Sequence, residues 1–267
     1  MPTLLSARSL FSSSVSHTFS SPKHSLKNKF LSFSSIKPYS RSQIKMSSTA
    51  IEHIVLFKVK ETTDSTKINT MLTSLNGLVS LEPVLHLAAG PLHRVKSSPI
   101  PFTHMLHSRY SSKDNLNTYS SHPSHVSVVK ENVLPVCDDI MAVDWIADDV
   151  DAGNLVPPPG SAIRVTFLKL KENLGEEVKN EILAVIKGIK GSFGGVIKQL
   201  TCGENFSPGR AKGYSIASLA VFDGLSEMEI VDAKEEMVNL HKEKVRDYLE
   251  SVIVVDYVVP SLQSASL

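Results

Sequence analysis

Cysteine is scarce in this chain, which has only Cys137 and Cys202 among its 267 residues. Two isolated thiols provide neither a disulfide framework nor the paired spacing of a zinc site, so we expect buried free thiols. Long apolar runs are lacking as well. Because no segment of about 18 consecutive apolar residues occurs, the sequence predicts no membrane-spanning helix.

Acidic residues are absent from positions 1–46, which hold seven Lys or Arg and fourteen Ser. A basic, serine-rich segment without the apolar core of a secretory signal is typical of an organelle transit peptide. We therefore expect residues 1–46 to be a disordered targeting presequence. A disordered tail without a targeting role is the alternative.

A surplus of positive charge is lacking in the rest of the chain, where 21 basic residues face 27 acidic ones, for a net charge of −6. A folded region with this balance has no broad electrostatic attraction for nucleic acid or for anionic lipid. We expect neither nucleic acid nor membrane as a partner.

The sequence does contain one unit twice. The first copy opens at His53-Ile-Val-Leu-Phe57 and closes at Val143-Asp-Trp145, and the second opens at Ile163-Arg-Val-Thr-Phe167 and closes at Val255-Asp-Tyr257. The openings are 110 positions apart and the closings 112, which indicates duplication of a whole small domain. Seven of the ten histidines lie between residues 53 and 125, so a polar site is expected in the first copy.

Hydrophobic periodicity predicts the same order of elements in both copies. The first has strands at 53–59, 84–89, 102–110 and 140–146, with helices over 68–79 and from 113 onward, the latter interrupted at His122-Pro123. The second has strands at 163–170, 196–202, 214–222 and 252–259, with helices over 178–189 and 226–249. This is the order of a ferredoxin-like unit. We predict an α+β fold in which two βαββαβ repeats pack their antiparallel sheets together as an intramolecular pseudo-dimeric barrel.

The two copies and the segment between them define the expected domain boundaries. We expect one domain at 51–148, a second at 162–260 and a short tail at 261–267. The acidic, glycine- and proline-rich segment 149–161 is expected to be a stiff, solvated linker.

Several segments resemble the plant stress-response A/B barrel family, which has the dimeric α+β barrel (Dabb) fold. The resemblance rests on His53-Ile-Val-Leu-Phe-Lys-Val-Lys60, Tyr119-Ser-Ser-His-Pro-Ser-His125 and Val143-Asp-Trp145, and it extends over both copies as in two-domain plant members. The N-terminal presequence is expected to address a chloroplast. The alternative is a peroxisome, because Ala265-Ser266-Leu267 is a loose relative of the signal Ser-Lys-Leu. A homodimer, beyond the internal pseudo-dimer, is also implied.

The resemblance suggests one chemistry. A polyketide cyclase of this family closes a linear tetraketide by an intramolecular aldol reaction, and its base histidine and catalytic tyrosine match His125 and Tyr119. An imidazole can take a proton next to a carbonyl at neutral pH, and a phenol can stabilise the enolate oxygen. The alternative is structural, with Tyr119 half-buried and His125 bonded to a carbonyl.

Other first-copy residues are candidates for the same site. His53 shares a strand face with Val55 and Phe57, which we expect to point into the barrel interior, so His53 is a third catalytic candidate. We expect His122, His107 and Phe57 to contact a small apolar or polyketide-like ligand. A satisfied core histidine is the alternative for His53.

The second copy lacks these groups. By the repeat offset, its residues at the positions of Tyr119, His122, His125, His53 and His107 are Val231, Lys234, Met237, Ile163 and Leu219. We expect the second copy to be a structural partner that completes the barrel. Its loop Gly203–Gly213 is expected to be a hairpin-type connection in water.

A structural Mg²⁺ is a further implication of the resemblance. Some relatives hold this ion through main-chain carbonyls at the end of the first helix, which would assign Leu75, Leu78 and Leu81. An ordinary solvated helix end is the alternative, and no cofactor is required.

Three functions remain open from the sequence. The favoured one is a stress-response barrel that binds a small ligand or protects, without catalysis. The second is a cyclase- or lyase-like enzyme that uses His125 and Tyr119, and the third is a structural subunit of a larger assembly.

Overall fold

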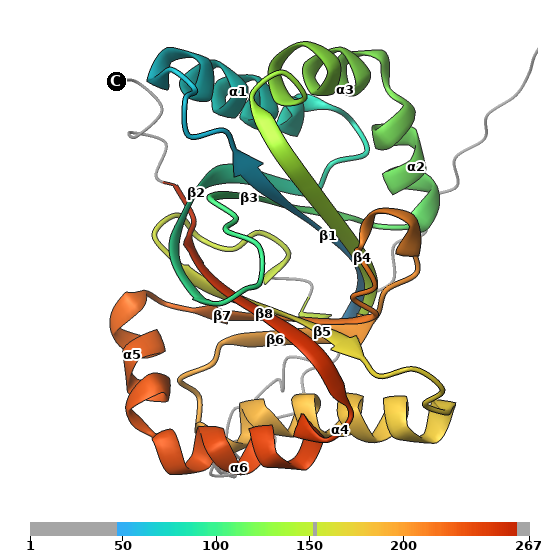
Figure 1. Ribbon diagram of the computed structural model, residues 1–267, viewed down its shortest axis with the longest axis vertical. Helices are drawn as coiled ribbons and strands as arrows, with labels where there is room; N and C mark the ends of the chain where they lie inside the picture. Colours follow the sequence, from blue (N-terminus) through green and yellow to red (C-terminus); the bar gives the residue numbers. More distant parts are fainter. Residues whose placement is uncertain (1–46, 152–153, 261–267) are drawn as a thin grey trace, which may run out of the picture. The chain divides into compact units, whose positions relative to one another are not determined.

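The computed structural model describes residues 47–151 and 154–260 (Figure 1). The expected presequence at 1–46 and the tail with its C-terminal tripeptide lie outside the described residues. Within the described ranges, no helix is long and apolar enough to cross a membrane.

Both repeats have the predicted element order. The first comprises β1 (Ser47–Val59), α1 (Ser65–Gly77), the 3₁₀ turn η1 (Leu78–Ser80), β2 (His86–Ser97), β3 (His104–Tyr110), α2 (Lys113–Ser121), α3 (Pro123–Val128), the π-helical turn η2 (Val129–Val133) and β4 (Cys137–Asp151). The second comprises β5 (Ala162–Leu170), α4 (Glu176–Ser192), β6 (Gln199–Glu204), the 3₁₀ turn η4 (Pro208–Arg210), β7 (Ile216–Phe222), α5 (Leu225–Ala233), α6 (Glu235–Arg246) and β8 (Leu249–Val258).

Local sequence explains where the helices begin and break. The Asp64 carboxylate accepts a hydrogen bond from the Thr66 amide at 2.7 Å and caps α1. His122-Pro123 separates α2 from α3, as predicted, and the His122 ring accepts from the Ser124 amide at 3.2 Å. The single helix expected over 226–249 is instead two helices that meet at Lys234.

The eight strands form one antiparallel sheet in the order β4-β1-β3-β2-β8-β5-β7-β6. Its two edge strands approach each other where Gly203 of β6 lies against Trp145 and Ile146 of β4, so the sheet is nearly closed. Helices α1–α3 lie on one outer side and α4–α6 on the opposite side (Figure 1). The predicted internal pseudo-dimeric barrel is confirmed.

Strand β2 joins the two repeats, and the sequence prediction missed this. The strand expected to end at Ala89 continues through Gly90-Pro91 to Ser97. It pairs with β3 as far as Pro91 and then with β8 from Leu92 onward. Pro91 has no amide proton to give, and it lies at the point where β2 changes partner.

Each half of the sheet has two buried faces. Ile54 and Leu56 point into the barrel interior and pack with Val165, Phe167 and other residues of both repeats. Phe57 and Val59 point the other way, into the core under α1–α3. The expectation that His53 and Phe57 line the barrel interior is therefore wrong. Strand alternation shows which residues share a face but not which of two covered faces is the inner one.

The strand register corrects the alignment of the repeats. His53 is paired with Asp144, and Arg164 is paired with Asp256 in the same position of the second repeat. Arg164, not Ile163, is thus the counterpart of His53. The copies are offset by 111 residues at this strand, one more than the Phe57–Phe167 match suggested.

Residues 154–161 of the linker are less solvated than expected. The Asn154 and Leu155 carbonyls both accept from the Arg109 guanidinium at 3.0 Å, and Pro157 is buried. Residues 154–157 therefore contact the barrel, while 158–160 are exposed.

Candidate functional site

The predicted catalytic residues do come together on the helix side of the first repeat, in what we term the histidine–tyrosine cluster: His53, Tyr110, Tyr119, His125 and Asp144. The His53 ring is hydrogen-bonded through Nδ1 to the Asp144 carboxylate. The ring centroids of Tyr119 and His125 are 4.6 Å apart, and those of Tyr119 and Tyr110 are 5.1 Å apart. Strands β1, β3 and β4 and helices α2 and α3 each supply one member.

The electrostatics of this cluster suit proton transfer. Burial raises the pKa of Tyr119 to about 12, so its phenol stays protonated and can donate. Burial lowers the pKa of His125, which keeps its ring neutral. Because the Ser120 carbonyl can only accept, His125 Nδ1 carries the proton of their 2.9 Å bond, and Nε2 is left as a base.

The aspartate of the cluster is held as a carboxylate. Burial raises the pKa of Asp144, but the charge and hydrogen bond of His53 outweigh it, and the pKa lies below its usual range. The pair therefore fixes the orientation of His53.

A loop of the second repeat covers this cluster. The Asn205 side chain accepts from the Asp144 amide at 3.1 Å, and the Phe206 amide donates to the Asp144 carbonyl at 3.0 Å. The Phe206 ring packs on the core under α1–α3, with Lys113 Nζ 4.1 Å from its centroid. The expectation of a solvated hairpin at 203–213 is wrong for this part. His53 and Tyr119 are only 4% and 1% exposed.

The three predicted ligand-contacting residues lie elsewhere. His122 is the half-exposed cap of α3, Phe57 is in the core under the helices, and His107 is inside the barrel. Tyr119 and His125 lie on separate helices, because α2 ends before His122.

A buried polar group inside the barrel, the interior cluster, was not predicted. Glu52 is fully buried and accepts from His107 at 2.7 Å and from Arg109 at 2.8 and 3.0 Å. Gln199 and Thr201 of β6 bond Arg109 and Glu52 at 2.7 and 3.0 Å. The cluster thus connects the two repeats. The sequence alone could not predict it, because these charged residues are brought together and buried only when the barrel closes.

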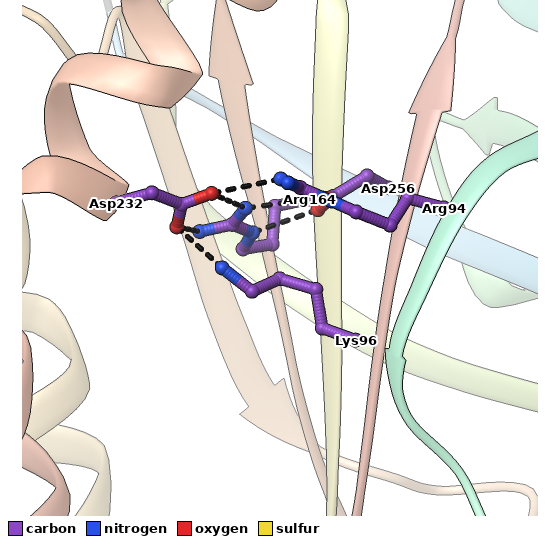
Figure 2. A network of polar contacts seen from close by, with 5 residues as sticks. All are labelled: Arg94, Lys96, Arg164, Asp232 and Asp256. Atoms are coloured by element: carbon purple, nitrogen blue, oxygen red, sulfur yellow. Dashed lines mark hydrogen bonds and ion pairs between the residues drawn. The ribbon is translucent and has the colours of Figure 1, made fainter.

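The second repeat has its own charged group, the salt-bridge cluster of Arg94, Lys96, Arg164, Asp232 and Asp256 (Figure 2). Arg164 bonds Asp256 at 2.7 and 3.0 Å and Asp232 at 2.7 and 3.0 Å. Arg94 bonds the same two carboxylates at 2.8 and 2.7 Å, and Lys96 bonds Asp232 at 2.5 Å. Arg94 and Lys96 come from β2, so the first repeat completes this cluster.

The salt-bridge cluster borders a cavity of about 620 Å³ between the sheet of the second repeat and helices α4–α6. Its walls are mainly apolar and include Val185, Ile189, Phe193, Ala220, Val238 and Val252. Arg164, Lys96 and Asp232 line one part of it. The expectation that the second repeat is only a structural partner therefore misses this cavity.

One wall of the cavity carries an unused acceptor. The Ser192 hydroxyl donates to the Gly188 carbonyl at 3.2 Å, so it accepts from His241 Nε2 at 3.0 Å. This leaves His241 Nδ1 unprotonated, and that atom is buried without a partner. Burial lowers the pKa of His241, which keeps the ring neutral.

The carbonyls suggested for Mg²⁺ are already engaged. Those of Leu75, Leu78 and Leu81 accept from the amides of Leu78, Leu81 and Val84, respectively. Each keeps one lone pair, so together they supply half of an octahedral oxygen shell. In the described part of the chain, no group of three His, Cys, Asp or Glu side chains is placed to hold a metal.

Comparison with known proteins shows the kinship of the chain. The model of the stress responsive A/B barrel domain matches residues 51–147 and 163–259. A stress-response A/B barrel domain-containing protein of Arabidopsis thaliana is 56% identical over 268 residues, covering 97% of this chain and 98% of the relative. A second Arabidopsis protein of that description is 50% identical over 216 residues, covering 80% and 99%. A candidate monooxygenase from Fusobacterium nucleatum superposes with a TM-score of 0.55 at 12% identity, over 81% of this chain and 94% of its own, which shows the fold alone.

Proposed function

The chain belongs to the stress-responsive A/B barrel family, and from this premise we propose that it is a binding protein for a small, largely apolar ligand. The observation that carries the proposal is the cavity of about 620 Å³ in the second repeat. Ligand sites are typically concave, of roughly 300–1,000 Å³, with apolar walls and a few placed polar groups. The cavity has this composition, with the salt-bridge cluster at one part and His241 at another.

Filling the cavity tests this function. Ala220 of β7 lines it, so Ala220→Phe places a ring where the ligand would lie. The matched control is Ala184→Phe, which adds the same ring on the exposed side of α4. We expect calorimetric titration with decan-1-ol to show binding by the wild type and the control but not by Ala220→Phe. Equal binding by both variants, or absence of binding of decan-1-ol, decanoate and decylammonium by the wild type, would reject the proposal.

A second candidate function rests on the histidine–tyrosine cluster. Its neutral His125 base and protonated Tyr119 support a cyclase- or lyase-like proton transfer next to a carbonyl, with His53 oriented by Asp144. The cover formed by Phe206 must open for a substrate to reach them, which makes this the weaker candidate.

Deuterium exchange into a linear β-diketone tests the enzyme candidate. We expect the wild type to accelerate exchange of the protons between the two carbonyls, and His125→Gln to abolish the acceleration while the protein stays folded. His93→Gln, at an exposed position of β2, is the control. Undiminished exchange in His125→Gln removes this candidate.

Compartment, ion and assembly are part of the proposal. We propose chloroplast targeting through residues 1–46, with the peroxisome through Ala265-Ser266-Leu267 as the alternative. Imaging of fusions that leave one or the other end free distinguishes the two.

The Mg²⁺ is optional, and an unchanged melting temperature in excess chelator would exclude it as a structural ion. A homodimer would appear as a doubled mass in size-exclusion chromatography with light scattering.

A further inference from the structure

We propose, on the basis of the ligand-binding function above, that the second-repeat cavity takes an anionic amphiphile. Its apolar chain lies among the side chains under α4–α6, and its carboxylate is held by Lys242 and Lys96.

A polar pocket adjoins the apolar cavity. It has a volume of about 300 Å³ and shares Lys96, Asp232, Val238 and Lys242 with the larger space. Glu235 and Asn239 complete its lining. An apolar compartment that continues into a polar one matches a molecule with an apolar tail and a charged head.

The charges around this pocket favour an anion. The two carboxylates of the salt-bridge cluster are saturated, since Asp232 accepts from three cationic side chains and Asp256 from two arginines. Lys242, in contrast, makes no ion pair with any residue that the structure describes. The pocket lining and the adjoining salt-bridge cluster together have four cationic side chains and three carboxylates. The cations are Arg94, Lys96, Arg164 and Lys242, and the carboxylates are Asp232, Asp256 and Glu235. A cationic head would meet no unpaired carboxylate except the exposed Glu235.

The start of helix α6 strengthens this preference. The helix begins at Glu235, and no side chain caps its first amides. Glu235, Val238 and Asn239 of its first turns line the polar pocket. Free amides add to the attraction of Lys242 for a carboxylate, while Glu235 and Glu236 of the first turn already offset the helix dipole.

The buried acceptor of His241 is an independent sign that the cavity is built for a guest. A buried nitrogen without a hydrogen-bond partner is unfavourable unless a donor satisfies it. A hydroxyl on the ligand chain, or a water that enters with the ligand, supplies the missing donor.

Three probes of equal chain length test the head-group preference: decanoate, decan-1-ol and decylammonium, each titrated calorimetrically into the full chain. Charge-assisted hydrogen bonds are roughly twice as strong as neutral ones, so we expect decanoate to bind at least about tenfold more tightly than decan-1-ol. We expect Lys242→Ala, alone or with Lys96→Ala, to remove most of this difference by weakening the binding of decanoate. Lys244→Ala, at an exposed position of the same helix outside the lining, is the matched control.

The outcomes separate this inference from the ligand-binding function itself. Decan-1-ol or decylammonium binding as tightly as decanoate overturns the anionic class and leaves the binding function standing. A decanoate preference that survives in the double variant also overturns the assignment to Lys242 and Lys96. Absence of binding by all three probes overturns both proposals. Melting temperatures of the variants establish that they are folded.

Discussion

In the described part of this protein, buried charged side chains form ion pairs, and several of their partners belong to the other repeat. Glu52 binds Arg109 within the barrel, while Asp256 binds Arg164 within the second repeat and Arg94 from the first. Removing one member of such a pair is costly because its partner stays buried and charged. These contacts are therefore sensitive points for single substitutions.

The interior cluster gives the first prediction at this scale. Glu52→Gln leaves the fully buried Arg109 without its counter-charge, and we expect the free energy of unfolding to fall by about 3 kcal/mol. Urea denaturation measures this loss. Glu82→Gln, at an exposed position, is the control and should cost less than about 0.5 kcal/mol. A loss below about 1 kcal/mol for Glu52→Gln would contradict the assigned role of this cluster.

A second prediction concerns acid stability. Burial, together with the nearby charges of His107 and Arg109, lowers the pKa of His86 to about 2, against the opposing effect of Glu52. Below pH 6.5 the unfolded chain binds a proton at His86 that the folded chain does not, so stability is present above pH 6.5 and declines below it. We expect His86→Met to reduce the slope between about pH 6 and 4.5 by about 1.4 kcal/mol per pH unit. Parallel stability curves for both proteins would show that His86 is protonated in the fold.

At the scale of elements, the sequence predicts most of the strands and helices but not their ends. Alternation and helical spacing identify the strands of β1 and β5 and the apolar stripe of α1, because each has one uniform pattern. They fail at β2, where Gly90-Pro91 has the composition of a turn but lies within a strand that changes partner. They fail again at Lys234, where no proline or glycine marks the break between α5 and α6.

The candidate site residues were likewise predictable only in part from the sequence. Tyr119 and His125 were correctly brought together, since a motif on adjacent short helices keeps its members close. His53 joined them through a strand face that faces the helices, not the interior. The salt-bridge cluster and the cover by Phe206 depend on contacts between the repeats, and a single sequence carries no local signal for those.

The attachment of α1 to the sheet gives a prediction at this scale. The Asn76 side chain donates to the Ala89 carbonyl and accepts from the Ala89 amide, both at 2.9 Å, at a part of β2 that has no strand on that side. Asn76→Ala leaves both backbone groups without these partners, and we expect a loss of about 2 kcal/mol in the free energy of unfolding. Asn69→Ala, exposed on the same helix, should be near neutral. Equal stabilities of the two variants in urea denaturation would disprove the tether.

At the scale of the whole molecule, duplication has produced two different sites on one scaffold. Each repeat sends a segment across to the other: β2 delivers Arg94 to Asp256, and the loop after β6 delivers Asn205 to Asp144. In the first repeat this segment covers a histidine–tyrosine cluster. In the second repeat, the segment from β2 completes the salt-bridge cluster that borders the cavity. The repeats thus share a fold but differ in the side chains placed between sheet and helices.

The seam between the edge strands provides a prediction for the closed barrel. A Cβ at Gly203 of β6 would lie 2.9 Å from the Ile146 carbonyl and 3.1 Å from the Trp145 ring. Gly203→Ala should therefore push β6 away from β4 and cost about 1–3 kcal/mol. Gly209→Ala, where a Cβ meets no atom within 4 Å, is the control. If both variants unfold at the same urea concentration, the strands do not approach each other in solution.

The most direct test of the account is to locate a bound amphiphile by NMR of ¹³C-labelled methyl groups during titration with decanoate. We predict that the methyl signals of Val185, Ile189 and Val238, which line the cavity, shift in a saturable way. Those of Ile54 and Val143 inside the barrel should stay in place. Shifts confined to the barrel interior or to the first repeat, or none at all, would contradict a ligand site in the second repeat.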